Sequence, residues 1–452
     1  MSRPLDRVQN LLVTPDNPPR DDVDGMDSER CAALHNAIYE HGWINAGRSA
    51  ESFLDQTTTL WDNLNNETRG KLHLSLQAFL REARTSNDQH MNFFYNFHGP
   101  IVIVDKEWYD PDPNRLLTLY GSYMSMASKL DGLVYDQHLH LATVHFDATD
   151  DLEVFPEQQP WRKLEDILTV WIEMVLRTKI RAVPNADTEM APWTAVPWTP
   201  QDLEECVELW GMIVDLIEQK MELETIERTT TGILDAATLA AARVPAGGFA
   251  QKFLLQAKKP RFENVAPGLR VPKAEDFIAQ PFTFAPLPPH FSAGDIPPIL
   301  LFRSGVSVSS VTLEVRGGFG GFGYPYPGST AIVSECPCGL YLNHCDPEGP
   351  LPFEDGCQLV LPFKLKEGYA KQGDFTNVEG HATLLQHGHN PYNVRHPLPL
   401  QAWLEKVYHL VEDGKWAVDA QGVAGGIEAW KQADTEEGWQ DYFESPGPGG
   451  YW

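Results

Sequence analysis

A histidine-rich stretch of alternating side chains, DQHLHLATVHFDATDD at Asp136–Asp151, most constrains what this chain can fold into. Apolar and polar residues alternate along it, which is typical of a β-strand with one buried face. The pattern predicts one or two strands over Leu133–Phe146. Imidazole is the commonest metal ligand and titrates near neutral pH. This stretch is therefore the first place to look for a chemical site.

A second histidine-rich stretch, HATLLQHGHNPYNVRH, lies far downstream at residues 381–396. In the first stretch, His145 and Asp147 are two residues apart and would share one face of a strand. A third ligand, His381, His387 or His389, would complete the two-histidine, one-carboxylate triad that suits Fe(II). We therefore expect the two stretches to meet in the fold.

Other side chains in the two stretches offer alternatives for the same site. His138 and His140 also share a strand face under this prediction and could replace His145 as ligands. Arg395 could anchor a co-substrate carboxylate by a bidentate contact. The candidate metal is Fe or Zn, although a single histidine is more often a surface or hydrogen-bonded residue. Besides His381, the candidate ligands are His138, His140, His145, Asp147, His387 and His389.

The charge of the chain excludes some classes of partner. The formal net charge is −28 and the isoelectric point is about 4.8, which disfavours non-specific nucleic-acid binding and adsorption to anionic membranes. The chain shows no apolar run near the length of a membrane span and no signal-peptide pattern at its start. We expect a soluble, cytoplasmic protein acting on a small molecule, and the oligomeric state stays open.

The distribution of apolar residues predicts an α+β fold, with a largely helical N-terminal half packed on a β-containing C-terminal half. The predicted regions are a mobile arm at 1–28, a mainly helical region with a short sheet at 29–244, a Pro/Gly-rich connector at 245–298 and an α+β region at 299–452. Strands are predicted at Ile101–Val104, Ile299–Phe302, Val306–Val315 and Gln358–Leu365. Helices are predicted at Ser49–Leu64, Leu72–Leu80, Trp161–Ile180, Pro200–Met221, Asp235–Arg243, Leu400–Val411 and Val423–Ala433.

Two runs of residues match known motifs, but neither lies in the structural context that its motif requires. Gly318–Gly323 matches the dinucleotide pattern GxGxxG, but Tyr324–Gly328 carries two prolines and cannot begin the helix that the pattern requires. A glycine-aromatic loop is the better interpretation. The acidic run Asp21–Asp24 is similar to a diphosphate-binding motif, but it lies in the Pro/Asp-rich arm rather than on a helix.

Four of the six cysteines, with His344 among them, are close together in the sequence. Thiolates and imidazole at such spacing can bind zinc, although no CxxC pair is present. Unmodified thiols and a disulfide are the alternatives. We expect packing of the neighbouring apolar residues, rather than a metal, to order this segment. The four cysteines are Cys336, Cys338, Cys345 and Cys357.

The stretches Arg261–Pro272 and Trp416–Trp439 resemble uncharacterised fungal proteins of similar length. The resemblance implies no activity. From the residues themselves, the leading hypothesis is a soluble small-molecule enzyme with a metal-assisted His/Asp site like that of a non-haem iron oxygenase. A metal-free variant would use one of the histidines as a general acid or base. The alternatives are a non-catalytic binding or interaction protein, and a Mg-dependent transferase or cyclase acting on a diphosphate.

Overall fold

The structure is a computed structural model, and it describes most of the chain. The described residues are 3–88, 90–98, 114–122, 132–145, 161–186, 190–224, 232–283, 296–308, 311–313, 331–333, 336–343, 345, 352–371, 383–384 and 398–442.

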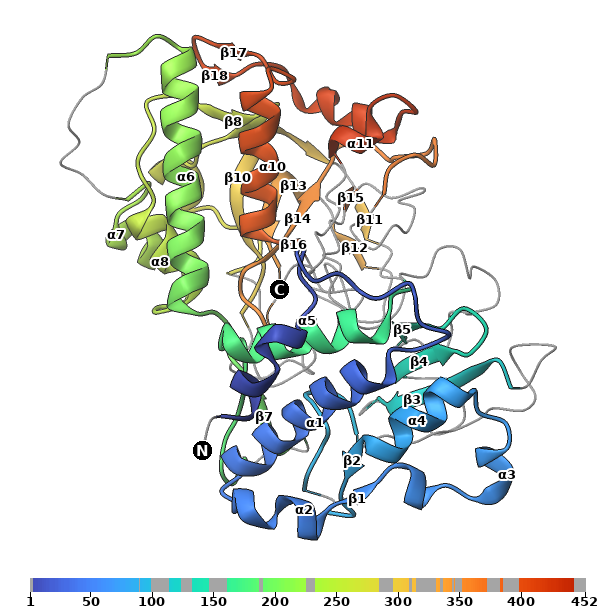
Figure 1. The fold of residues 1–452 in the computed structure, drawn as a ribbon. Coiled ribbons are helices and arrows are strands. Elements are labelled where there is room, and N and C mark those ends of the chain that lie inside the picture. Colours follow the sequence, from blue (N-terminus) through green and yellow to red (C-terminus); the bar gives the residue numbers. More distant parts are fainter. Residues whose placement is uncertain are drawn as a thin grey trace. The chain divides into compact units, whose positions relative to one another are not determined.

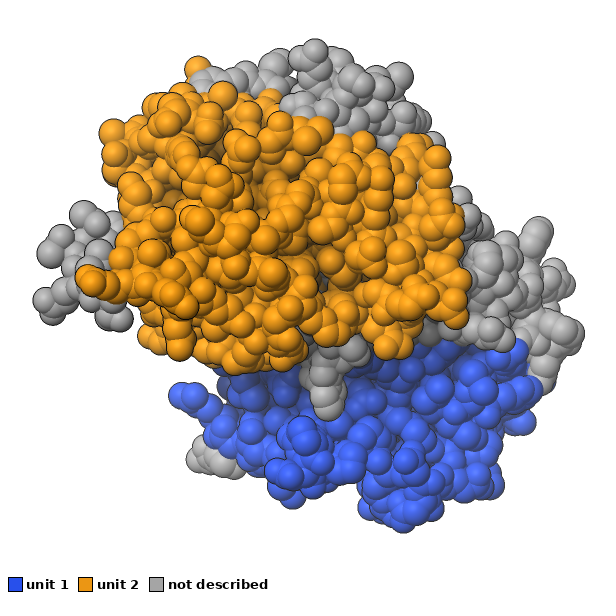
Figure 2. Space-filling model, turned by 90° about the horizontal axis from the view of Figure 1, so that it is seen from above, with its two compact units in different colours: residues 1–196, 390–394, 446–450 blue, residues 197–389, 395–445, 451–452 orange. Residues whose placement is uncertain are grey.

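The chain divides into two compact units, coloured separately in Figure 2. Among the described residues, unit 1 ends at Val196 and unit 2 begins at Pro197. The division therefore falls upstream of the Pro/Gly-rich segment 245–298, and the described part of that segment contains helices of eight and four residues and two short strands. Both units combine helices with strands, which confirms the mixed α and β class. The finer division into a helical half and a β half stays a prediction.

Unit 1 is drawn in blue to green in Figure 1. Its described elements, in chain order, are η1 (Pro4–Leu11), α1 (Ser28–Asn45), η2 (Ala50–Ser52), α2 (Phe53–Gln56), β1 (Thr58–Thr59), η3 (Trp61–Asn63), α3 (Asn66–Arg69), α4 (Leu74–Glu82), β2 (Arg84–Thr85), β3 (Leu116–Gly121), β4 (Gly132–Asp136), β5 (Leu141–His145), α5 (Leu164–Leu176), β6 (Ile180–Ala182) and β7 (Trp193–Ala195).

The sheet of unit 1 is a three-stranded antiparallel meander in the order β3-β4-β5. The core beside it is aromatic: Phe93 stacks on Tyr120 with ring centroids 4.3 Å apart, and Phe94 stacks on Trp171 at 5.1 Å. His35 of α1 lies in the same stack, 4.5 Å from Phe93. Aromatic rings bury a large apolar area each, so this cluster fixes α1 and α5 against the sheet.

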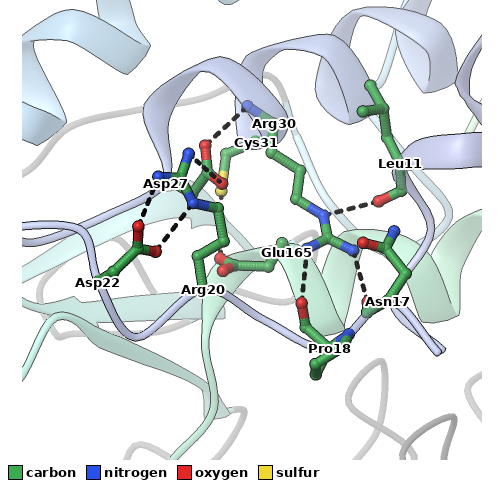
Figure 3. A network of polar contacts seen from close by, with 9 residues as sticks. All are labelled: Leu11, Asn17, Pro18, Arg20, Asp22, Asp27, Arg30, Cys31 and Glu165. Atoms are coloured by element: carbon green, nitrogen blue, oxygen red, sulfur yellow. Dashed lines mark hydrogen bonds and ion pairs between the residues drawn. The ribbon is translucent and has the colours of Figure 1, made fainter. Parts of the chain in front are cut away.

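The N-terminal segment of unit 1 is attached to α1 by one buried guanidinium (Figure 3). Arg30 donates from Nε to the carbonyl oxygen of Leu11 at 2.7 Å, from Nη1 to that of Pro18 at 3.0 Å and from Nη2 to that of Asn17 at 3.1 Å. Residues 3–27, for which the sequence predicts a mobile arm, also bury Leu5 and other apolar side chains. We call residues 3–27 the N-terminal segment below.

Unit 2 contains one large mixed sheet in the order β15-β14-β13-β10-β9-β8-β18-β17, with β16 paired to β14. Its described elements are α6 (Pro200–Lys220), α7 (Ala236–Ala241), α8 (Phe249–Gln256), β8 (Asn264–Ala266), β9 (Leu269–Arg270), α9 (Ala274–Phe277), β10 (Ile299–Val308), β11 (Val311–Leu313), β12 (Ala331–Val333), β13 (Cys336–Leu342), β14 (Gly356–Val360), β15 (Thr383–Leu384), β16 (Leu398–Pro399), α10 (Leu400–Glu412), β17 (Val418–Asp419), β18 (Gly422–Val423), η4 (Ile427–Asp434) and α11 (Trp439–Tyr442).

The long helices α6 and α10 lie side by side in Figure 1 and cover the core of unit 2. α6 begins where the sequence predicts, because Thr199 and Asp202 form a capping box and Pro200 occupies the first helical position. The helices meet the sheet through stacked rings: Phe302 lies 5.4 Å from Trp210 and 5.6 Å from Trp403.

Two predicted helices are wrong. Ser49–Leu64 is broken into η2, α2, β1 and η3, because the guanidinium of Arg84 binds the carbonyl oxygens of Leu54 and Thr57, both at 2.7 Å. Val423–Ala433 consists instead of the end of β18 and the 3-10 helix η4. The predicted strand Ile101–Val104 and the glycine-aromatic loop at 318–323 lie outside the described residues.

Candidate metal centre

Three side chains of unit 1 lie close enough together that they could hold a metal ion: Asp24, His73 and His140. One ligand atom from each lies within 4.8 Å of the other two. Among the residues that the structure describes, this is the group of three or more His, Cys, Asp or Glu side chains found with such geometry. The three come from the N-terminal segment, the start of α4 and the turn between β4 and β5, so the fold brings together residues that are distant in the sequence.

His140 is positioned by the carboxylate of Asp136 at the end of β4. This buried carboxylate accepts hydrogen bonds from the backbone N–H groups of His138 at 2.8 Å and Leu139 at 3.0 Å, and its other oxygen binds Nε of Arg115 at 2.8 Å. The turn closes with His140 in the left-handed region, at φ 56°. Such backbone is uncommon for residues other than glycine, and it concentrates at functional sites.

His73 immediately precedes α4 and acts as its N-cap. Its Nδ1 lies 3.3 Å from the backbone N–H of Ser75, which donates to it, and 2.8 Å from the Ser75 hydroxyl. The backbone N–H of His73 donates to Oε1 of Gln137 at 2.7 Å. Because Gln137 lies in the β4–β5 turn and also bonds the carbonyl oxygens of Lys71 and Asn114, it ties the turn carrying His140 to the segment carrying His73.

Asp24 is held next to the histidines by the two residues that follow it. The backbone N–H of Met26 donates to the Ser75 hydroxyl at 3.1 Å. Gly25 has φ +93°, and a Cβ there would come within 2.3 Å of Ser75 Oγ and 3.0 Å of His73 Cε1. A residue without a side chain is therefore required where the N-terminal segment passes this close to α4. The Asp24 carboxylate itself is exposed.

The two imidazole rings are in contact and each has a hydroxyl at Nδ1. Their centroids are 4.5 Å apart with a 53° tilt. His73 Nδ1 faces Ser75 Oγ at 2.8 Å, and His140 Nδ1 faces the Tyr135 hydroxyl at the longer distance of 3.4 Å. Metal-ligating histidines characteristically bond a polar group through the second ring nitrogen. This arrangement leaves Nε2 of each ring as the nitrogen that could bind an ion.

Electrostatics favour the neutral, metal-binding form of His140. Burial lowers its pKa below the usual value of 6.5, the proximity of His73 and Lys163 lowers it further, and Asp24 and Asp136 act in the opposite direction. The imidazole is therefore mostly uncharged at neutral pH. Metal binding requires this form, because a protonated nitrogen has no lone pair to offer.

The three ligands need only a small movement to bind an ion. Ligand atoms at about 2.0–2.2 Å from a metal stand about 3–3.6 Å apart, so groups now within 4.8 Å of one another close by no more than about 1–2 Å.

Another histidine of unit 1 shows what a purely structural role looks like. His35 is fully buried, and both of its ring nitrogens have partners: the Tyr120 hydroxyl at 2.9 Å and the carbonyl oxygen of Arg84 at 2.8 Å. Burial lowers its pKa to about 4. His35 therefore stays neutral and has no nitrogen left for a metal, unlike His73 and His140.

A buried thiol-carboxylate pair lies in the same unit (Figure 3). The Cys31 thiol donates to Oε2 of Glu165 at 3.5 Å, and Oε1 of Glu165 is buried without a hydrogen-bond partner. Burial raises the pKa of Glu165 and raises that of Cys31 well above its usual value. Both groups also raise the pKa of Tyr135, so the pair lies close to the tyrosine that contacts His140.

Of the predicted ligands whose side chains the structure describes, one belongs to this site. His140 is in it, while His138 is exposed on the same turn. The prediction that these two share a strand face is wrong, because Asp136 closes the hairpin at this point. The backbone of His145 ends β5, and its side chain is outside the described part of the chain. Asp147, His381, His387, His389 and Arg395 are also outside it, so the predicted triad of His145, Asp147 and a downstream histidine stays a prediction.

The sequence analysis missed Asp24 and His73. Asp24 belongs to the acidic run that was set aside because it lies in the Pro/Asp-rich arm. The signal that could have reversed this decision is the apolar run Leu11–Val13, since a segment that buries such side chains is packed rather than mobile. His73 gave no such signal, because the predicted helix Leu72–Leu80 includes it, whereas α4 begins one residue after it, at Leu74.

The cysteine segment shows no such ligand group in its described part. Cys338, Cys345 and Cys357 are buried and carry no disulfide, and the Cys345 thiol donates to the carbonyl oxygen of Pro352 at 3.3 Å. The side chain of Cys336 and all of His344 lie outside the described residues. The expectation that packing orders this segment therefore stays a prediction.

Comparison of the chain with family models, with curated proteins and with solved structures gives no match. None of the described helices is both long enough and apolar enough to span a membrane.

Proposed function

We propose that unit 1 binds a divalent transition-metal ion through Asp24, His73 and His140 and uses it in a reaction on a small organic molecule. The observation that carries the proposal is the convergence of two imidazoles and one carboxylate within 4.8 Å. The hydroxyl at Nδ1 of each ring supports it, because second-ring hydrogen bonds of this kind orient metal-binding histidines.

The number of protein ligands favours catalysis. Structural zinc sites have four protein ligands, whereas catalytic sites have three and leave a position for water or substrate. Two histidines and one carboxylate are also the ligand set of non-haem Fe(II) oxygenases. The imidazoles argue against magnesium, which prefers oxygen ligands, and so against the diphosphate transferase or cyclase alternative at this site.

Charges around the centre indicate the class of substrate. Lys163 is close enough to lower the pKa of His140, and its Nζ lies 4.0 Å from Oδ1 of Asp21. A cation beside a metal favours an anionic group on the substrate, such as a carboxylate. This is the role that the sequence analysis gave to Arg395. The net charge of −28 supports a small-molecule partner rather than nucleic acid or an anionic membrane surface, and a cytoplasmic location belongs to the same proposal.

A non-catalytic role is the second candidate, and one observation favours it. The three ligands come from three separate segments, and the exposed one, Asp24, lies on the N-terminal segment. A metal ion there would join this segment to α4 and to the β4–β5 turn. In that case the ion would contribute to folding stability rather than to a reaction.

The first experiment measures metal binding directly. Full-length protein without a histidine tag is analysed for bound metals after purification, and the metal-free protein is titrated with Co²⁺, Zn²⁺ and Fe²⁺ (the last under anaerobic conditions). We expect one ion per chain for the wild type and loss of that ion in His73→Ala and His140→Ala. His138→Ala is the matched control, because His138 is an exposed histidine on the same turn and its removal should leave binding unchanged.

The second experiment separates the catalytic from the structural role. Azide is added to the Co²⁺-loaded protein, and the visible absorption of the cobalt is recorded. An open position predicts that azide binds and shifts the bands. Unchanged bands, together with a large rise in melting temperature on metal binding, would favour the structural role. Absence of stoichiometric binding by the wild type would overturn the proposal altogether.

A further inference from the structure

We infer that Ser75 and Tyr135 are positioning residues that set which nitrogen of His73 and of His140 carries the ring proton, and so direct Nε2 of both rings to the ion. The inference rests on the metal site proposed above and deepens it. It concerns two hydroxyl groups, neither of which is itself a ligand.

Ser75 connects two of the three ligand segments. Its hydroxyl oxygen lies 2.8 Å from His73 Nδ1, and it accepts the backbone N–H of Met26 at 3.1 Å. Met26 is two residues from Asp24, and Gly25 packs directly against Ser75. A single hydroxyl on the first turn of α4 therefore contacts a ligand ring and the segment that carries the carboxylate.

Tyr135 provides the equivalent hydroxyl for the other ring. It belongs to β4, where its side chain is buried, and its hydroxyl lies 3.4 Å from His140 Nδ1. The Ser75 hydroxyl is near enough to that of Tyr135 to lower the tyrosine pKa, although burial raises this pKa by more. A phenol hydroxyl such as that of Tyr135 can accept a hydrogen bond from a ring N–H while donating its own proton elsewhere.

The need for such residues follows from the chemistry of imidazole. A neutral ring that gives the Nε2 lone pair to a metal must carry its proton on Nδ1. That proton requires an acceptor, and the hydroxyl oxygens of Ser75 and Tyr135 are the groups placed at the two Nδ1 atoms. Without them, the proton would prefer Nε2, where it blocks the metal.

At His73, the N-cap contact of α4 favours the opposite tautomer, so the Ser75 hydroxyl is needed all the more there. In the structure, Nδ1 of His73 accepts the backbone N–H of Ser75 at 3.3 Å, which needs the proton on Nε2. Metal binding moves this proton to Nδ1. The bond to the Ser75 backbone is then lost, and the bond to the Ser75 hydroxyl remains with His73 as the donor. Ser75 therefore holds the ring in both states, and only its hydroxyl does so in the metal-bound state.

The test uses Ser75→Ala and Tyr135→Phe, and the chain supplies a matched control pair. Tyr39 is also a buried tyrosine of unit 1, and its hydroxyl bonds the Ser86 hydroxyl at 2.7 Å. Tyr39→Phe and Ser86→Ala remove equivalent groups from a pair that, within the described part of the chain, makes no hydrogen bond to Asp24, His73 or His140. Co²⁺ affinity, the visible spectrum of bound Co²⁺ and stability in EDTA are measured for all four variants.

We expect Ser75→Ala and Tyr135→Phe each to weaken Co²⁺ binding by about 10- to 100-fold and to shift the cobalt bands. The control variants should bind as tightly as the wild type, with the same spectrum, even if their stability in EDTA falls. A merely structural role would change stability without changing the spectrum of the bound ion.

The inference can also be tested on the wild type, so that it stays testable if a variant fails to fold. Long-range ¹H–¹⁵N NMR of histidine-labelled protein reports the tautomer of each ring, with His73→Ala and His140→Ala assigning the signals. We expect His73 to carry its proton on Nε2 in the metal-free protein and on Nδ1 with Zn²⁺ bound. Normal Co²⁺ affinity and spectrum in both hydroxyl variants, or a Zn²⁺-bound His73 with its proton still on Nε2, would overturn the inference while leaving the metal site intact. Failure of the wild type to bind Co²⁺ or Zn²⁺ would overturn both.

Discussion

In each unit, one buried charged side chain binds a stretch of irregular backbone. The charge in unit 1 is a cation that donates hydrogen bonds to carbonyl groups, and the charge in unit 2 is an anion that accepts them from N–H groups. In unit 1, the Arg30 guanidinium donates to three carbonyl oxygens, of Leu11, Asn17 and Pro18. In unit 2, the Asp434 carboxylate accepts four backbone N–H groups, of Lys366, Glu367, Tyr369 and Ala370, at 2.6–3.0 Å. Both charged side chains are almost fully buried.

The difference lies in the reach of the two groups. A carboxylate is small and holds one tight loop of five residues, 366–370. A guanidinium has five donors in a wide fork, so Arg30 holds carbonyl groups that are seven residues apart in the sequence. The segment held in this way continues to Asp24, whereas the loop on Asp434 contributes to no candidate site among the described residues. The Arg30 contact therefore holds a segment that belongs to the proposed metal site, and the Asp434 contact does not.

The largest effect on stability is expected for Asp434→Ala. The change removes a charge-assisted acceptor from four N–H groups at once, so we expect the free energy of unfolding of unit 2 to fall by about 3 kcal/mol. Chemical denaturation followed by tryptophan fluorescence measures this. Asp419→Ala, at an exposed aspartate that accepts a single N–H, is the control. Metal binding by unit 1 should not change, and a loss of Co²⁺ affinity in Asp434→Ala would break the proposed contrast.

Arg30→Lys tests the other side of the comparison. Lysine keeps the charge but cannot bond three separated carbonyl groups, so we expect a loss of about 2 kcal/mol together with faster proteolysis within residues 3–27. Because Asp24 is on this segment, Co²⁺ affinity should also fall. The control is Arg20→Lys, since Arg20 is exposed and pairs with Asp22. Unchanged proteolysis and affinity in Arg30→Lys would show that the segment is held by its apolar side chains instead.

Gly25→Ala is expected to have a smaller effect on stability, about 1–2 kcal/mol, but a clear effect on metal binding. Its Cβ would displace the Ser75 hydroxyl. Gly247→Ala in unit 2 separates the two causes, because Gly247 also has a positive φ, of +81°, but has nothing within 4 Å of the added Cβ. Equal loss of stability in the two variants, with normal Co²⁺ affinity in Gly25→Ala, would show that backbone strain alone explains the change.

The smallest effect concerns the pH dependence of unit 1. Burial raises the pKa of Glu165 in the folded state, so the protonated side chain stabilises the fold at low pH, and this stabilisation is lost as the pH rises through the folded-state pKa. Glu165→Gln cannot lose a proton. Relative to the wild type, its free energy of unfolding should therefore rise as the pH rises through the folded-state pKa of Glu165. Glu29→Gln, at an exposed glutamate of α1, is the control. A pH-independent difference between Glu165→Gln and the wild type would contradict the assigned cause.

The sequence predicted the long elements of the fold well. The apolar periodicity of α5, α6 and α10 and the Thr199–Pro200 start of α6 are local features, and local features can be read from one sequence. Ser49–Leu64 has the same periodicity but is not one helix. Its carbonyl groups bond Arg84, which is about 20–30 residues away, and such a tertiary contact overrides local propensity.

The candidate site was predicted only in part. The density of histidines singled out His140, but the turn that presents it depends on the Asp136 carboxylate, and alternation alone did not reveal this turn. Asp24 lies in an acidic run of the predicted mobile arm and His73 lies inside a predicted helix, so neither position indicated a metal ligand. They become recognisable when Ser75, Gln137 and Gly25 bring their segments together, and these contacts depend on the folded chain.

The spacing of the three ligands has a consequence for folding. Asp24, His73 and His140 are about 50 and about 70 residues apart, so in the unfolded chain they rarely meet, and the entropy needed to close two such loops keeps the affinity of that chain for metal low. An ion would therefore bind almost only to the native state and would act as a removable cross-link. Its contribution to stability would follow the concentration of metal by mass action. The concentration of metal around the protein would therefore also determine the stability of the fold formed by the first 140 residues of the chain.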